Sequence, residues 1–256
     1  MKTIKELEDI LFDEWHSECR SNLSEIENNN NKIYIENKEF IEDGLVNEDG
    51  WNEAPIKVIF ILKEINNSKK DIYKNHRWNL RQYLLNGELA PKDKTYRNVS
   101  RWAYGILNNV SKWDNNVEKI GNDINKRKEN LRKIGVINVS KQPGVERTKF
   151  KDLECKFSEY NKLFLEKQLA LYTDAKLIIC CGSGVCDLFK QSITDMNFGN
   201  YKAGKGITDD ETGIWYTQLE RGQILISYKH PSIIAGNEKL FNNLMKLTNK
   251  LLKEID

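Results

Sequence analysis

Cysteine, histidine and proline are scarce in this sequence of 256 residues. The five cysteines are odd in number and form no CxxC pair, and three of them crowd together near residue 180, which argues against a disulfide framework. The three histidines, His16, His76 and His230, lie far apart, and the usual spacing of zinc ligands is missing. We therefore expect neither a metal nor a cofactor.

Long apolar runs are also lacking, and none approaches the roughly 20 residues that a membrane-spanning helix needs. The N-terminal segment MKTIKELEDILFDEWHSE is acidic and amphipathic, so we do not interpret it as a signal peptide. Forty Lys and Arg against 38 Asp and Glu leave a formal net charge of +2. That balance excludes a strongly basic nucleic-acid binder of the histone type. It does not exclude a local basic groove, because the net charge averages over all faces of the molecule.

The length favours a single domain over residues 1–256, and 39% hydrophobic residues suit a substantial core. Apolar residues at helical spacing predict an N-terminal helix over about residues 2–23. Further helix-like stretches predict a helical insert at about 70–133.

Four short apolar runs rich in β-branched residues predict strands that are buried on both faces. They cover residues 57–62, 134–139, 175–181 and 223–228. Helix-like stretches separate these runs, so the sequence predicts an α/β fold: a three-layer α/β/α sandwich with a central four-stranded, mostly parallel sheet. The Gly-rich segment 195–220 predicts a small antiparallel hairpin or loop before the last strand.

Polar or conformationally special residues follow each of the four predicted strands. In such sheets ligands bind beyond the carboxyl ends of the strands. The four segments are 63–68, 140–145, 182–185 and 229–232. Their convergence on one edge predicts a functional site there.

Glu64 follows the first predicted strand directly. A carboxylate at this rim could orient a water molecule or stabilise a developing cation, or it could simply cap a helix or form a salt bridge. Asn66 or Asn67 could orient a water through the amide oxygen, or cap the next helix. The second strand ends at Asn138, whose planar amide suits the edge of a pyrimidine, although it could equally satisfy loose backbone groups.

The remaining strand ends offer an anion site and a histidine. The turn at Gly182-Ser-Gly184 could hold an anion at a helix N-terminus, or could be a plain tight turn. His230 is followed by a proline, which aims it rigidly, and it could donate to a leaving group. The cysteines at 180, 181 and 186 could include a nucleophile, but buried inert thiols are the better interpretation.

In this order, the motifs resemble the uracil-DNA glycosylase superfamily, most closely its family 4 enzymes. The matching segments are Lys63-Glu-Ile-Asn-Asn67, Asn138-Val-Ser-Lys-Gln-Pro-Gly144, Cys181-Gly-Ser-Gly184 and His230-Pro-Ser232, with a helix Phe164-Leu-Glu-Lys-Gln-Leu-Ala-Leu171 before the third strand. The first motif lacks the family's glycines and proline. Cys19 echoes one ligand of the family's iron–sulfur cluster, but Asn22 and Gln142 occupy other ligand positions, so we expect no cluster.

The resemblance implies an enzyme that flips a base out of DNA and hydrolyses its N-glycosidic bond in base excision, as in DNA repair. Glu64, or else Asn66, would orient water and stabilise the sugar cation, and His230 would stabilise the departing base. Asn138 would read the base edge, and Tyr73 or Trp78 would stack on it. The DNA-binding residues would be Lys141, Gly144, Ser183, Lys229, Ser232 and, as a wedge, Ile233.

The resemblance implies DNA as the partner, a monomer, and a cytoplasmic location at a bacterial nucleoid. The substrate would be uracil or a bulkier modified pyrimidine, and phage defence by excision of modified phage bases is a variant of this function. The alternatives are a non-catalytic DNA-binding module of the same fold and a nucleotide-binding or small-molecule α/β enzyme. Basic residues near the site predict one positive face, with the acidic surplus elsewhere. They are Lys63, Lys69, Lys70, Lys141, Arg147 and Lys229.

Overall fold

The computed structural model describes most of the chain. The described residues are 2–27, 40–65, 77–86, 93–144, 151, 153–154, 157, 159–201, 204–233 and 236–254, without the side chains of 19–27 and 159–160. Asn66 and Tyr73 lie outside the described residues.

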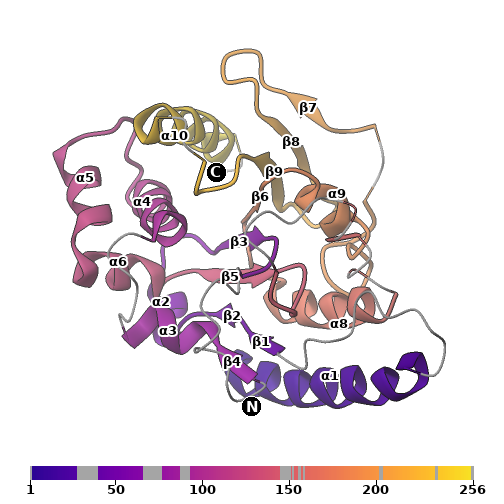
Figure 1. Ribbon diagram of the computed structural model, residues 1–256. Coiled ribbons are helices and arrows are strands. Elements are labelled where there is room, and N and C mark those ends of the chain that lie inside the picture. Colours follow the sequence, from indigo (N-terminus) through magenta and orange to yellow (C-terminus); the bar gives the residue numbers. More distant parts are fainter. Residues whose placement is uncertain are drawn as a thin grey trace.

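Helices and strands alternate along the chain (Figure 1). The helices are α1 (Ile4–Glu27), α2 (Glu48–Glu53), α3 (Leu80–Asn86), α4 (Lys94–Leu107), α5 (Asn115–Asn122), α6 (Ile124–Leu131), α8 (Glu159–Leu169), the 3-10 helix η1 (Ala170–Tyr172), α9 (Val185–Lys190) and α10 (Asn237–Lys253). The strands are β1 (Phe40–Glu42), β2 (Gly44–Leu45), β3 (Val58–Leu62), β4 (Arg77–Asn79), β5 (Gly135–Asn138), β6 (Leu177–Cys181), β7 (Ile207–Thr208), β8 (Trp215–Gln218) and β9 (Ile224–Tyr228).

The main sheet has the strand order β2-β5-β3-β6-β9-β8-β7. Its four central strands are the predicted ones and run parallel to one another, which confirms the mixed α/β architecture. The predicted number of strands in this sheet, four, was too low, because β2 and the hairpin of β8 and β7 add antiparallel strands at the two edges. The hairpin lies within the segment 195–220, where the sequence predicted a hairpin or loop. Strand β2 is only two residues long, too short to give a clear apolar pattern.

Side chains of the central strands point alternately into two cores, one on each face of the sheet. On one face, Phe60 of β3 stacks on Trp102 of α4 with 6.4 Å between ring centroids. On the other face, Ile59 of β3 lies in the core that includes Trp15 of α1. Helices cover both faces because continuous apolar strands need burial on both sides. Figure 1 shows α4 and α10 on one side of the sheet and α1 and α8 on the other.

The order of the central strands creates a switch point in the sheet. From β3 the chain first adds β5 on one side, and then returns to add β6 and β9 on the other side. At such a reversal the loops after the two neighbouring strands diverge, which leaves a crevice at their carboxyl ends. The fold therefore favours a ligand site where β3 and β6 end.

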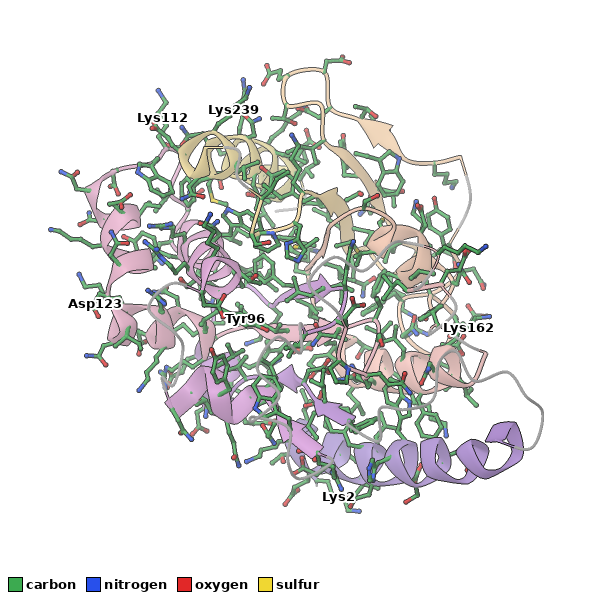
Figure 2. All side chains as sticks on the ribbon, in the orientation of Figure 1. Lys2, Tyr96, Lys112, Asp123, Lys162 and Lys239 are labelled. Carbon is green, nitrogen blue, oxygen red and sulfur yellow. The ribbon has the colours of Figure 1, made fainter. Side chains whose placement is uncertain are left out.

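Charged side chains lie mainly on the outside of the molecule, as Figure 2 shows for Lys112, Asp123 and Lys239. Among the described residues, no helix combines the length and the apolar character needed to cross a membrane.

Candidate functional site

A cleft of about 860 Å³ opens at the carboxyl ends of β6 and β9, next to the end of β3. It brings together four of the side chains to which the resemblance gave a role, with two further lysines at its rim. The four are Ser183, Lys229, His230 and Ile233, and the other lysines are Lys63 and Lys239. The cleft thus lies at the edge where the topology favours a ligand.

The ring of His230 is held by the short turn that follows β9. The backbone N–H of Ser232 donates to Nδ1 of His230 over 3.2 Å, and Oγ of Ser232 lies 2.8 Å from the same nitrogen. Since a backbone N–H can only donate, Nδ1 must be the unprotonated nitrogen of the ring. A neutral His230 therefore carries its proton on Nε2, for which the described residues provide no acceptor.

Burial and a neighbouring lysine keep His230 neutral. Partial burial lowers the pKa of His230 below its usual value, and the positive charge of Lys63 lowers it further. Both side chains lie close to Gly182, because a Cβ built there would be 3.4 Å from Cδ2 of His230 and 3.4 Å from Cε of Lys63. The cleft therefore contains a neutral histidine beside a cationic amine.

Helix α4 supports the histidine turn from below. Nδ2 of Asn98 donates to the carbonyl oxygen of Pro231 over 2.6 Å, and Nη1 of Arg101 holds Oδ1 of Asn98 at 3.1 Å. Asn98 is only 3% exposed. No sequence pattern indicates this role, because Asn98 stands within an ordinary amphipathic helix.

The turn after β6 packs against the end of β9. Gly182 has a φ of 116° and Gly184 a φ of 76°, and only glycine adopts these values readily. The N–H of Gly182 donates to the carbonyl oxygen of Tyr228 over 2.8 Å. This bond places Ser183, which is exposed, at the rim of the cleft beside His230.

Glu64 lies over the segment that follows β5. The N–H of Gly144 donates to the carbonyl oxygen of Ile65 over 2.7 Å, and a Cβ at Gly144 would come within 2.3 Å of Cγ of Glu64. Gly144 is therefore needed for the close approach of the Glu64 side chain. Oε2 of Glu64 is buried and has no hydrogen-bond partner in the described part of the chain. A buried acceptor in this state can take a donor from a ligand or water.

Asn138 and Lys141 belong to a buried polar network around Asp43. The backbone N–H and Nδ2 of Asn138 both donate to Oδ2 of Asp43, over 2.7 and 3.0 Å. Nζ of Lys141 pairs with Oδ1 of Asp43 at 2.6 Å, and Nε2 of Gln168 donates to the same oxygen over 3.1 Å. Glu8 joins the network through Gln168, whose Nε2 also lies 3.0 Å from its Oε1.

This network corrects the expectation that Lys141 binds DNA. The residue is 2% exposed, and its ammonium group lies over the rings of Phe12 and Trp15 as well as beside Asp43. Asn138 is fully buried and does not line the cleft, so no base contacts it in this conformation. Its Oδ1, however, is buried without a partner among the described residues.

Trp78 lies on β4, where its ring centroid is 5.3 Å from that of Tyr83, and it does not line the cleft. The expectation that it stacks on a base at this cleft has no support from its placement. Asn66 and Tyr73, together with Lys69, Lys70 and Arg147, fall outside the described residues.

The three cysteines near residue 180 are buried and free. Burial raises the pKa of Cys180 and Cys181 well above the ordinary value for a thiol. A hydrogen bond from Cys180 lowers the pKa of Cys186, which lines the cleft while the other two do not. The expectation of inert thiols therefore fits Cys180 and Cys181 better than Cys186.

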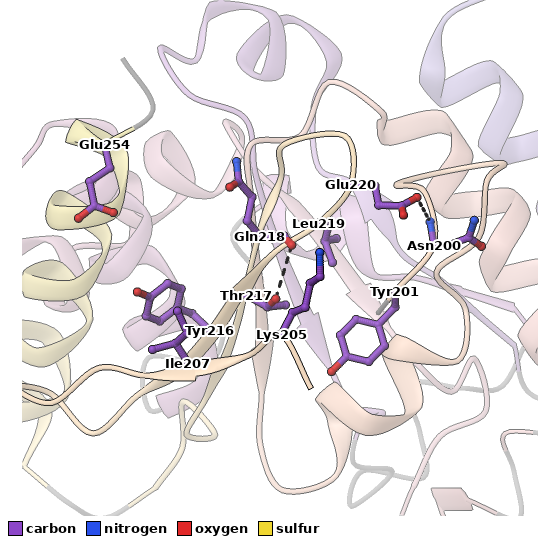
Figure 3. A pocket seen from close by; sticks show the side chains of 10 residues that line it. All are labelled: Asn200, Tyr201, Lys205, Ile207, Tyr216, Thr217, Gln218, Leu219, Glu220 and Glu254. Carbon is purple, nitrogen blue, oxygen red and sulfur yellow. Dashed lines mark hydrogen bonds between the residues drawn. The ribbon is translucent and has the colours of Figure 1, made fainter. Parts of the chain in front are cut away.

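A second pocket, of about 450 Å³, lies beside the hairpin of β7 and β8 (Figure 3). Its lining includes Tyr201, Lys205 and Tyr216, and none of the residues that the strand-end motifs predicted. Within the described residues, no group of three or more His, Cys, Asp or Glu side chains could hold a metal ion.

Comparison with known proteins identifies no relative. No protein-family model, no curated protein and no solved structure matches this chain.

Proposed function

We propose that this protein is a DNA glycosylase of the uracil-DNA glycosylase type, which flips a modified or deaminated base out of DNA and hydrolyses its N-glycosidic bond. The observation that carries the proposal is His230, a neutral histidine whose Nε2–H has no acceptor in the described part of the cleft. The resemblance of the four strand-end motifs points to the same reaction, and the cleft at the switch point of the sheet supports a ligand site there.

His230 would stabilise the departing base. When the N-glycosidic bond breaks heterolytically, the base gains negative charge, and a fixed N–H donor in a partly buried site stabilises that charge without reorganising. Lys63 adds a positive charge beside the ring, which favours the base anion and disfavours protonation of His230. The proton on Nε2 is therefore shared in a hydrogen bond to the base, and His230 starts as the neutral form.

Glu64 would act on the sugar side of the same bond. The sugar develops positive charge as the base leaves, and a carboxylate facing it lowers the barrier, as in the hydrolysis of other glycosides. Oε2 of Glu64, which has no partner among the described residues, is an acceptor that can also orient the attacking water. Gly144 permits this placement because it has no side chain.

DNA would lie across the mouth of the cleft. Lys229 and Lys239 are exposed there, and Ser183 offers a hydroxyl at the rim. Ile233 is 40% exposed at the same mouth, where an apolar side chain can enter the stack that the flipped base leaves. A monomer at the bacterial nucleoid, in repair or in phage defence, fits this proposal.

A second candidate is a DNA-binding module of the same fold without catalysis. It is favoured by the complete burial of Asn138, which keeps this side chain from a base in the present conformation. The two candidates agree on DNA binding and differ in chemistry.

The test is incubation of the protein with oligonucleotides that carry uracil, hypoxanthine or modified cytosines, scored for abasic sites, with DNA affinity measured on the same oligonucleotides. The glycosylase proposal predicts abasic sites in at least one oligonucleotide. Tight DNA binding without abasic sites would establish the non-catalytic module instead. Neither binding nor abasic sites would refute both candidates.

A further inference from the structure

Lys63 is the first residue after β3, and it lines the cleft. Its backbone is fixed, because its carbonyl oxygen accepts the N–H of Ser140 over 3.0 Å. Cε of Lys63 and Cδ2 of His230 each lie 3.4 Å from the position that a Cβ at Gly182 would take. The lysine side chain therefore starts from a fixed strand end and lies beside the ring to which we assign a role in base excision.

The amine of Lys63 is not engaged by the described part of the chain. Among those residues, no acceptor holds its Nζ in a hydrogen bond and no carboxylate forms an ion pair with it. The neighbouring side chain of His230 is neutral and brings no negative charge. Lys63 is also half-buried, whereas Lys229 and Lys239 are exposed at the rim of the same cleft. A lysine amine without a carboxylate that holds it as the ammonium is a suitable nucleophile toward a carbonyl carbon.

The proposed reaction supplies such a carbonyl in the same cleft. Hydrolysis of the N-glycosidic bond leaves an abasic sugar, whose ring opens to an aldehyde at C1′. A lysine amine adds to an aldehyde and forms an imine with loss of water. Because His230 would contact the departing base and Lys63 lies beside His230, the amine is near the carbon that the base leaves.

We propose that Lys63 gives this protein a second activity, the covalent capture of the abasic sugar followed by cleavage of the DNA strand on its 3′ side. This activity rests on the proposed function and goes beyond it, because the abasic sugar is the product of base excision. The amine adds to the C1′ aldehyde and water leaves, which forms a protonated imine. The imine makes the C2′ hydrogen acidic. As this proton passes to water, the C3′–O bond breaks and its electron pair leaves with the phosphate of the downstream strand. Hydrolysis of the imine then returns the free amine and an unsaturated sugar aldehyde on the upstream strand.

The test uses the full-length protein and an oligonucleotide that already carries an abasic deoxyribose, so that it does not depend on base excision. Borohydride reduces an imine to a stable amine, and the protein–DNA adduct is then isolated on a denaturing gel and mapped by mass spectrometry of its peptides. We expect an adduct on Lys63 and, without borohydride, cleavage of the strand at the abasic site. An oligonucleotide with tetrahydrofuran in place of the deoxyribose has no aldehyde and should give neither.

The matched variant is Lys63→Arg, which keeps the positive charge beside His230 but cannot form the imine. It should lose both the adduct and the strand cleavage. Lys112→Arg changes an exposed lysine that does not line the cleft, and this control should keep both.

The result for Lys63 is separate from the result for base excision. An adduct on another amine, or no adduct at all, would overturn the inference, and base excision by the same protein would then leave the glycosylase proposal intact. An adduct on Lys63 in a protein that excises none of the tested bases would support the inference and refute the glycosylase proposal.

Discussion

The backbone N–H of Ser232 donates to Nδ1 of His230 over 3.2 Å. This bond determines which nitrogen of the ring carries the proton, because Nδ1 must accept. The short turn after β9 therefore determines the tautomer of a histidine that lines the cleft.

Replacing Lys63 by methionine should raise the pKa of His230, because the lysine charge lowers it in the native protein. Glycosylase activity that needs neutral His230 falls as the pH drops through this pKa. The acid limb of the pH–rate profile should therefore move to higher pH in Lys63→Met. Titration of the histidine ring protons by NMR measures the same change directly.

The control for this prediction is Lys229→Met, which removes the charge of the residue next to His230 in the chain. Lys229 is exposed and does not contribute to the low pKa of His230. Its variant should keep the acid limb in place while weakening DNA binding. A shift of equal size in both variants would refute a specific effect of Lys63.

Adding a methyl group at Gly144 should displace the carboxylate of Glu64, for which we propose a catalytic role. In Gly144→Ala the new Cβ would lie 2.3 Å from Cγ and Oε1 of Glu64, so Glu64 must move. We expect at least about a tenfold loss of excision rate, since misplacement of about 1 Å is costly in catalysis. The control is Gly236→Ala, where a Cβ has no neighbour within 4 Å and φ is −45°. Full activity of Gly144→Ala would exclude Glu64 from the reaction.

Lys141 should matter for stability and not for DNA affinity. Lys141→Met leaves Asp43 as a buried charge without its ion-pair partner, which typically costs about 3–5 kcal/mol of unfolding free energy. Lys133→Met removes a half-exposed pair with Glu129 and should cost less than about 1 kcal/mol. Urea unfolding measures both. A Lys141 variant of native stability that has lost DNA affinity would restore the original expectation for this residue.

Glu8 should make the protein less stable as the pH rises toward neutrality. Burial raises the pKa of Glu8 to about 7, against the opposing effect of Arg81 and of hydrogen bonds from Tyr172 and Gln168. The folded state then binds a proton that the unfolded state has released, so stability falls between about pH 4.5 and pH 7. The size of this contribution is of the order of 3 kcal/mol.

Glu8→Gln should remove this part of the pH dependence, which is read from unfolding free energies of the variant and the native protein across the same pH range. Glu14→Gln, an exposed residue on the same helix, serves as the control and should leave the curve unchanged. Parallel curves for Glu8→Gln and the native protein would show that Glu8 titrates as an ordinary glutamate.

The sequence predicted the parallel part of the sheet well, because β-branched runs such as that around Phe60 are distinctive when a strand is buried on both faces. It also predicted that His230 and Ser183 share one edge, since parallel strands end together. Short edge strands such as β2 escaped prediction, because two residues carry no periodic pattern.

The prediction failed where a polar residue turned inward. From the sequence, Lys141 was expected to be a surface cation in a loop. In the structure its ammonium group lies over the rings of Phe12 and Trp15. It also pairs with Asp43, which lies almost a hundred residues earlier in the sequence. Such pairs depend on tertiary contacts that local patterns do not contain, and the same holds for Asn98 beneath the histidine turn.

The role of His230 in base excision is tested most directly by the single-turnover rates of the native protein and of His230→Ala, on the oligonucleotide from which the native protein excises the base best. His16→Ala is the control, because it changes a histidine that does not line the cleft. We predict that His230→Ala folds, binds the oligonucleotide and excises the base about a hundredfold more slowly or worse, the usual effect of losing one preorganised donor to a developing anion. A His230→Ala protein that excises the base at the native rate would contradict this role.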